Sequence, residues 1–113
     1  MTPDQFRAIA LGMQGAIEGE HMRHPDFRAN GRIFASLHAD DLWGTVMLAP
    51  EEQREFLELK PAMFKPSSGA WGRQGCTDVR LSAADARTLT QAMTLSWERV
   101  MAKPPARPRT KRR

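Results

Sequence analysis

The segment AWGRQG, residues 70–75, combines an aromatic and a basic side chain on a turn rich in glycine. Trp71 offers the kind of ring that stacks on an unpaired base, and Arg73 offers a guanidinium for a phosphate. Lys65 and Arg80 stand on either side of this turn and extend the same chemistry. The alternative is structural: Trp71 closes over the edge of a sheet, and the glycines serve only the turn. Such a pattern more often has the structural meaning.

Further cationic groups lie beside a predicted turn and at the end of the chain. Arg32 follows Asn30-Gly31, so it could reach a phosphate from the tip of a hairpin, although a solvated arginine is the simpler interpretation. The last eleven residues hold six Lys or Arg and no acid. If all six contacted phosphates, the logarithm of the binding constant would fall with that of the salt concentration at a slope of about −5. A solubilising extension is the equal alternative. The six are Lys103, Arg107, Arg109, Lys111, Arg112 and Arg113.

The side chains able to bind a metal or act as a nucleophile form no set in the sequence. His21 and His24 are ligands that zinc accepts, but residues three apart on one strand face opposite sides. They converge only if the chain bends at Pro25. Cys76 has no neighbouring group in the sequence that would lower its pKa. Ser67-Ser68-Gly69 lacks the spacing and the lysine of a phosphate-binding loop. We therefore predict no catalytic residue, no metal and no cofactor.

The bulk composition is that of one globular domain. Of the 113 residues, 17 are basic and 13 acidic, which gives a formal net charge of +4 and an isoelectric point near 10.0. Without the last eleven residues, 11 basic and 13 acidic side chains remain, so the part expected to fold is slightly acidic. The single cysteine allows no disulfide within the chain. No signal peptide or membrane span is apparent, and we expect a reducing, cytoplasmic setting.

Capping signatures predict where two of the helices begin. Thr2 and Gln5 form a capping box before an amphipathic helix whose apolar stripe extends to Ile17. Ser82 with Asp85 forms a second signature before a long final helix. A middle helix is expected over residues 50–59, where proline opens the segment and two glutamates follow.

Alternating apolar residues predict five strands, and Asn30-Gly31 between two of them predicts a tight hairpin. The strands are expected near residues 20–29, 32–38, 43–48, 62–65 and 76–81. In RIFASL, residues 32–37, the alternation predicts one face with Ile33, Ala35 and Leu37 and another with Phe34 and Ser36. In the last strand it predicts a buried face with Thr77, Val79 and Leu81 and a wet face with Cys76, Asp78 and Arg80.

This order of elements predicts an α+β fold in two layers. Hairpin-like spacing indicates an antiparallel sheet, and the helices at the two ends of the chain must cover one of its faces to bury their apolar stripes. We expect a single domain over residues 1–102. The prolines and charges of residues 103–113 predict a disordered tail.

Several phrases in this order resemble the MmcQ/YjbR family of small bacterial proteins. They are HPDFRANGRIFASL at 24–37, the VMLAPEEQREFL segment, PAMFKPSSGAWGRQGCTDVRL at 61–81, and a closing helix with SW at 96–97. The resemblance implies an α-β(3)-α-β(2)-α arrangement like that of type III secretion chaperones. It also implies DNA binding through a double-wing motif, and no catalytic residues. The basic tail is not part of the family pattern.

The sequence thus leads to the hypothesis of a non-enzymatic DNA-binding protein, whose binding is electrostatic and largely independent of sequence. The tail would supply affinity, and the hairpin tips with Trp71 and Arg73 would supply shape preference. The alternative is a protein-interaction or dimerisation module that captures a partner by strand addition. A continuous positive face would favour DNA binding by the folded part, whereas interspersed acids would confine it to the tail. The residues expected in such a face are Arg32, Lys65, Arg73 and Arg80.

Overall fold

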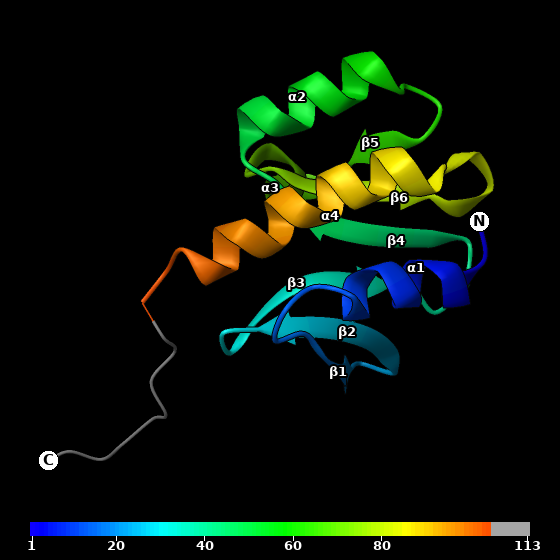
Figure 1. Ribbon diagram of the computed structural model, residues 1–113. Helices are drawn as coiled ribbons and strands as arrows, with labels where there is room; N and C mark the ends of the chain where they lie inside the picture. The colour runs from blue at the N-terminus through cyan, green and yellow to red at the C-terminus, as the bar shows by residue number, and fades with distance from the viewer. Residues whose placement is uncertain (105–113) are drawn as a thin grey trace, which may run out of the picture.

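The computed structural model describes residues 1–104, which form a six-stranded antiparallel sheet with helices (Figure 1). The strand order in the sheet is β1-β2-β3-β4-β6-β5. The strands are β1 (Ile17–His21), β2 (His24–Ala29), β3 (Arg32–Leu37), β4 (Trp43–Met47), β5 (Phe64–Pro66) and β6 (Cys76–Arg80). The helices are α1 (Pro3–Leu11), α2 (Pro50–Leu59), α3 (Gly69–Arg73) and α4 (Ala86–Met101), and a 3-10 turn spans Leu81–Ala83. The predicted α+β class with an antiparallel sheet is confirmed.

Local capping explains where the two terminal helices begin. The Thr2 hydroxyl accepts a hydrogen bond from the Gln5 N–H, and the Gln5 side chain accepts one from the Thr2 N–H, as the capping box predicts. At α4 the Asp85 carboxylate accepts from the Thr88 N–H. Ser82 does not cap this helix, because it lies in the 3-10 turn that precedes it. Asp85 alone therefore carries the capping function predicted for the pair.

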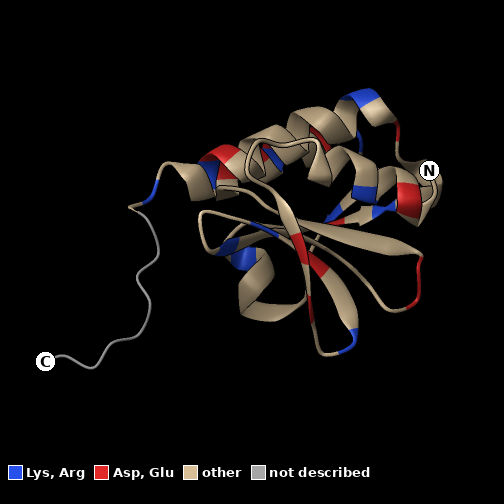
Figure 2. Ribbon diagram, turned by 60° about the horizontal axis from the view of Figure 1, so that its bottom comes forward, with Lys and Arg blue, Asp and Glu red and all other residues tan. Residues whose placement is uncertain are grey.

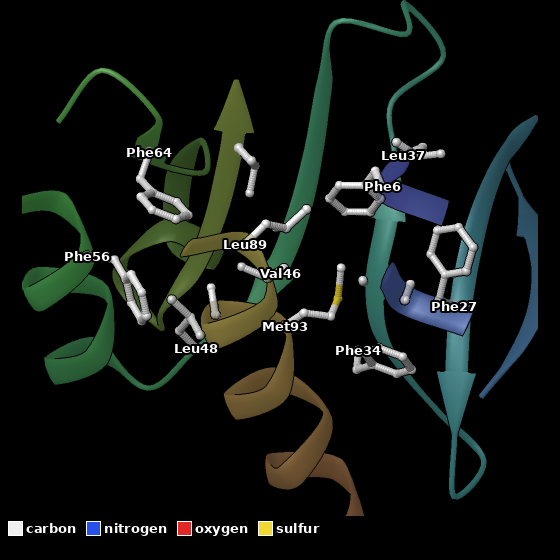
Figure 3. Packing of buried hydrophobic residues seen from close by; sticks show 14 of the residues in the cluster. Phe6, Phe27, Phe34, Leu37, Val46, Leu48, Phe56, Phe64, Leu89 and Met93 are labelled. Carbon is white, nitrogen blue, oxygen red and sulfur yellow. The ribbon is translucent and has the colours of Figure 1, made fainter. Parts of the chain in front are cut away.

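The helices α1 and α4 lie on one face of the sheet, which we call the covered face (Figure 1). Its core contains Phe6, Phe27, Phe34 and Met93, which pack together without solvent exposure (Figure 3). Gly44 permits the approach of α1, because a Cβ there would lie 2.5 Å from Cε2 of Phe6.

Ser96 of α4 fastens this helix to two strands. Its buried hydroxyl donates to the Phe34 carbonyl of β3 and accepts from the Met47 N–H of β4 at 2.8 Å. Both bonds satisfy backbone groups that burial would otherwise leave unpaired. The position of α4 over the sheet is therefore fixed by directional bonds as well as by apolar packing.

Residues 17–29 form a hairpin instead of the single strand predicted near 20–29. Met22 and Arg23 adopt positive φ angles of 49° and 71°, which make a two-residue turn of the hairpin type. The first helix accordingly stops at Leu11, and Ile17 lies in β1 with 63% exposure rather than on the helix stripe. The turn was missed because neither residue is the Asn or Gly that usually marks one.

The predicted alternation in β3 is wrong at two positions, because Ile33 lies on the face opposite to Ala35 and Phe34 lies on the same face as Ala35. Arg28 pairs with Ile33 and Phe27 pairs with Ala35, so Phe34 is the extra residue of a β-bulge. Phe34 therefore lies beside Met93 in the core (Figure 3), on the same face as Ala35 and opposite to the face predicted for it. As predicted, the Phe34 ring is covered by another element, and that element is α4.

Two smaller differences concern the segment between α2 and α4. The glycine-rich turn predicted around Trp71 contains a short helix, α3, and the strand expected at 62–65 begins two residues later, at Phe64. In β6, Thr77 and Val79 are buried as predicted. Asp78 is also buried, at 9% exposure, although its face was expected to be wet.

Candidate functional site on the open face of the sheet

The face of the sheet opposite α1 and α4, which we call the open face, carries a continuous row of polar side chains. Strand register places Asp26 opposite Ser36, Ser36 opposite Thr45, Thr45 opposite Asp78, and Asp78 opposite Lys65. Directly opposed residues share a face, so these five side chains form one row, here called the polar row. All except Lys65 are buried. Buried polar groups are costly unless paired, so their hydrogen bonds are informative.

One end of the polar row is an ion-paired cluster around Asp26. Arg28 holds its carboxylate through two bonds, Nε to Oδ1 at 2.7 Å and a second guanidinium nitrogen to Oδ2 at 2.9 Å. His21 Nδ1 lies 2.6 Å from Oδ2. The hydrogen bonds from Arg28, supported by that from His21, hold the pKa of Asp26 below its ordinary value although burial alone would raise it. The same pair raises the pKa of Arg28.

The other end is a hydrogen-bonded chain around Asp78. The Ser67 hydroxyl donates to Asp78 Oδ1 at 2.6 Å, and the Thr45 hydroxyl donates to the same oxygen at 3.2 Å. His38 Nε2 lies 2.8 Å from the Thr45 hydroxyl and 3.8 Å from Asp78 Oδ1. Ser67 also lies 3.2 Å from the sulfur of Cys76.

These groups do not make a nucleophile. In a serine or cysteine hydrolase a histidine must take the proton of the nucleophile, and a carboxylate orients that histidine from behind. Here the Ser67 hydroxyl donates directly to Asp78, so the carboxylate occupies the place that a histidine would need for that chemistry. Burial raises the pKa of the Cys76 thiol, and the hydrogen bond from Ser67 only partly opposes this. The cluster is suited to binding a polar ligand rather than to attacking one.

A cleft of about 500 Å³ lies over the Asp78 end of the polar row. Its walls combine hydrogen-bonding groups of Ser36, His38, Thr45, Ser67 and Asp78 with the apolar surfaces of Met47 and Trp71. His24 closes one side, and its Nδ1 is buried without a hydrogen-bond partner among the described residues. We call this the polar cleft.

Trp71 projects from α3, which is anchored from two sides. The Gln53 amide of α2 donates to the carbonyls of Gly72 and Cys76, both at 3.0 Å. Gly72 packs so tightly that a Cβ would lie 1.9 Å from the Ser67 carbonyl oxygen. The Trp71 ring is nevertheless 70% exposed, so it does not close over the sheet edge.

A second cleft, of about 230 Å³, shares Trp71 with the polar cleft. Arg32, Arg99 and Lys103 line it, and we call it the basic cleft. The Asn30 amide donates to the carbonyls of Val100 and Lys103, and Arg32 donates to the Pro104 carbonyl at 2.8 Å. These bonds fix residues 100–104, at the end of α4, to the turn between β2 and β3 beside the basic cleft.

The remaining cationic residues singled out in the sequence lie elsewhere. Lys65 and Arg80 flank the Trp43 ring, with Nζ and Cζ at 4.3 and 4.4 Å from its centre. Arg73 is exposed on α3. Five candidates lie outside the described residues: Arg107, Arg109, Lys111, Arg112 and Arg113. The predicted tail over 103–113 is described only as far as residue 104.

The folded part has no continuous positive face made of the predicted residues. Asp78 lies directly opposite Lys65 and two residues from Arg80, and acidic and basic segments are interspersed along the chain (Figure 2). Arg32 and Trp71 share the basic cleft, whereas Lys65 and Arg80 belong to the group around Trp43. Sequence reasoning missed Arg99, which is adjacent to this cleft only because α4 ends there.

His21 and His24 do converge, contrary to the argument from a single strand. The turn at Met22 and Arg23 makes them directly opposed residues of β1 and β2, with ring centres 4.5 Å apart. In the described part of the chain, no group of three or more His, Cys, Asp or Glu side chains is arranged to hold a metal ion. Within the same residues, no helix has the length and apolar character needed to cross a bilayer.

Comparison with known proteins bears on the fold. No family model matches the sequence, and neither does any curated protein. The crystal structure of Deinococcus radiodurans protein DR2400, described by the domain DUF419, is similar with a TM-score of 0.75 and 19% sequence identity. The match covers 90% of this chain and 80% of that one. At this identity the likeness shows a shared α+β fold.

Proposed function

We propose that the protein is a non-enzymatic, cytoplasmic DNA-binding protein of the MmcQ/YjbR type, which uses Trp71 and the basic cleft. The main observation behind this proposal concerns Trp71. This residue is 70% exposed on an anchored helix, and it borders a cleft with three cationic side chains. The resemblance of the sequence to that family and the DUF419 fold of DR2400 are consistent with this assignment.

The exposure of Trp71 supports a binding role because the ring is held there. Gln53 and Gly72 fix α3, so the exposed position is part of the packed structure. Tryptophan is highly buried on average, and here its large apolar ring borders two clefts, where a ligand can reach it. Every base presents a face on which such a ring can stack, whatever the sequence.

The cations of the basic cleft support phosphate contacts next to that ring. Arg99 and Lys103 are exposed and have no ion pair with a described acid, and Arg32 uses its guanidinium on backbone carbonyls only. Such groups release counterions from nucleic acid without first breaking an internal pair.

The test is binding of a fluorescently labelled 20-base-pair duplex and a single strand, followed by anisotropy over a range of salt concentrations. A chain ending at Pro104 keeps the bonds to Asn30 and Arg32 and loses five cations. We expect its salt slope to be shallower than that of the full chain by about 4 to 5 on the duplex and by about 3 to 4 on the single strand. Arg99→Ala should reduce the slope by about 1, uniformly across sequences.

Arg87→Ala is the matched control, because Arg87 is exposed on the same helix and does not line the basic cleft. It should leave binding nearly unchanged. Absence of binding by the full chain near physiological salt would overturn the proposal. An equal loss of DNA affinity in Arg87→Ala and Arg99→Ala would show that only overall charge matters. The basic cleft would then drop out of the proposal.

Self-association is a second candidate function, favoured by the edge strand β1. Ile17 is 63% exposed there, and Met22 at the adjoining turn is 85% exposed. An edge strand offers unpaired backbone groups to a second chain, and apolar side chains add to that contact. Light scattering should then show a dimer that Ile17→Lys converts to a monomer. A monomeric wild-type chain at high concentration would exclude this function.

A further inference from the structure

The polar cleft and the basic cleft meet at Trp71, and their chemistries differ. The polar cleft contains a carboxylate and several hydroxyls, whereas the basic cleft contains three cations. A nucleotide likewise has two chemically different ends, a hydrogen-bonding base and a phosphate. We propose that the polar cleft receives one unpaired base of single-stranded DNA, and that it selects cytosine or adenine, which carry an amine where thymine and guanine carry a carbonyl oxygen. This inference rests on the proposed DNA-binding function.

Asp78 supplies the group that would recognise the amine. Its Oδ1 already accepts hydrogen bonds from Ser67 and Thr45, which hold the carboxylate in one orientation. Its Oδ2 accepts none from residues 1–104, so it remains free to accept from a ligand. A carboxylate accepts from the N4 amine of cytosine, whereas thymine presents the O4 acceptor at the same place.

Ser36 supplies a second, complementary group. It lies on the same polar row as Asp78, with Thr45 between them, and it lines the cleft. Its hydroxyl makes no hydrogen bond to another described residue. A hydroxyl can donate to a ring nitrogen or a carbonyl oxygen of a base. An acceptor and a donor are therefore spaced along one wall of the cleft.

Trp71 connects this cleft to the phosphate-binding groups. Because its ring borders both clefts, a base stacked against it can place its sugar and phosphate toward Arg32, Arg99 and Lys103. The cleft volume of about 500 Å³ lies within the range of small-molecule sites. A paired base cannot enter, because its Watson–Crick edge is occupied and it must first leave the stack. The proposal therefore predicts a preference for single strands.

The experiment measures anisotropy of labelled dC12, dA12, dT12 and a blunt duplex with the full chain at one salt concentration near physiological. We expect dC12 and dA12 to bind about tenfold more tightly than dT12, as a hydrogen bond to a charged group would give. Cytosine and thymine have the same ring size, so the dC12 to dT12 ratio is the primary readout. Asp78→Asn should bring this ratio to about one, because the amide can also donate to thymine O4.

Two controls separate base recognition from charge and from folding. Glu58→Gln removes one negative charge from an exposed position on α2 and should leave the dC12 to dT12 ratio unchanged. Circular dichroism melting checks that Asp78→Asn is folded. Ser36→Ala is the second variant, because it removes the unpaired hydroxyl and keeps the carboxylate. A hydroxyl can donate or accept, so this variant should weaken dC12 and dT12 binding alike, severalfold, and keep the ratio.

The outcomes distinguish this inference from the proposed function. Equal binding of dC12, dT12 and the duplex, unaffected by either polar-cleft variant, would overturn the base site while leaving DNA binding in place. A lower affinity for dC12 than for dT12 would also overturn it. No binding of any oligonucleotide would overturn both proposals. A retained preference in folded Asp78→Asn would remove Asp78 from the recognition.

Discussion

The two faces of the sheet use the same strands in opposite ways. On the covered face Phe6, Phe27 and Met93 are fully buried in the apolar core. On the open face Asp26 and Asp78 are also buried, at 0% and 9% exposure, but each is surrounded by groups that donate to it. One face is buried by helices laid across it, and the other by side chains that hydrogen-bond to one another.

This difference separates stability from function. Burying apolar side chains is favourable in proportion to the area removed from water. Burying an ion pair is close to neutral, because desolvation cancels most of the attraction, and a well-packed apolar set can replace such a pair without loss. The covered face therefore explains why the chain folds. The open face calls for another explanation, and the base site proposed above is one that needs fixed donors and acceptors.

The largest expected effect comes from the covered face. Phe6→Ala should lower the free energy of unfolding by about 3–5 kcal/mol, because it empties a site that backbone neighbours such as Gly44 cannot fill. Urea unfolding followed by circular dichroism measures it. Leu11→Ala, on the same helix but 39% exposed, is the control and should cost much less. Equal losses would contradict the assignment of the core to this face.

An intermediate effect is expected from Asp26→Asn on the open face. At neutral pH it should cost about 1–3 kcal/mol, because Arg28 and His21 lose the charged acceptor between them. The pKa of Asp26 is lowered in the fold, so its stabilising contribution is complete above the unfolded value near 3.8 and is lost as the pH falls through the folded value.

The pH dependence sharpens this second prediction. The stability difference between wild type and Asp26→Asn should be constant from about pH 5 to neutrality and should shrink as the pH falls below about 4. Urea titrations at each pH measure it. Glu58→Gln, which removes an exposed acid on α2, should follow the wild-type curve. A difference that stays constant down to pH 2 would show that the Asp26 carboxylate carries none of this dependence.

The smallest effect is expected where the open face meets solvent. Lys65→Met removes the ammonium 4.3 Å from the Trp43 ring and keeps the alkyl chain, so we expect a loss of about 0.5–1 kcal/mol. Repeating the substitution together with Arg80→Met tests whether the two cations act independently, since both contact the same ring. A gain in stability in the single variant would mean that repulsion from Arg80 exceeds the attraction to the ring.

The sequence predicted the elements whose signals are local. The capping box at Thr2, the Asn30-Gly31 turn and the helix over 50–59 each depend on residues close together in the chain, and each is present. The turn at Met22 and Arg23 was missed because ordinary side chains adopt its positive φ angles only with support from the surrounding sheet.

The polar row could not be predicted, because it depends on the register of four strand pairings at once. An error of one residue in any pairing would move Ser36 or Asp78 to the other face. Of the predicted binding residues, Trp71, Arg32 and Lys103 meet because α3, the β2–β3 turn and the end of α4 come together in space. Nothing in their spacing along the chain contains that information.

The bulge at Phe34 has a consequence for how this fold tolerates changes in length. Removing one residue from the interior of a regular strand reverses the orientation of every side chain on one side of the cut. Here Phe27 and Arg28 already pair with Ala35 and Ile33, so omission of residue 34 would restore an uninterrupted ladder with both partners kept. Sequences that share this architecture can therefore carry a one-residue gap at this point, with one aromatic ring fewer in the interior and an unchanged topology.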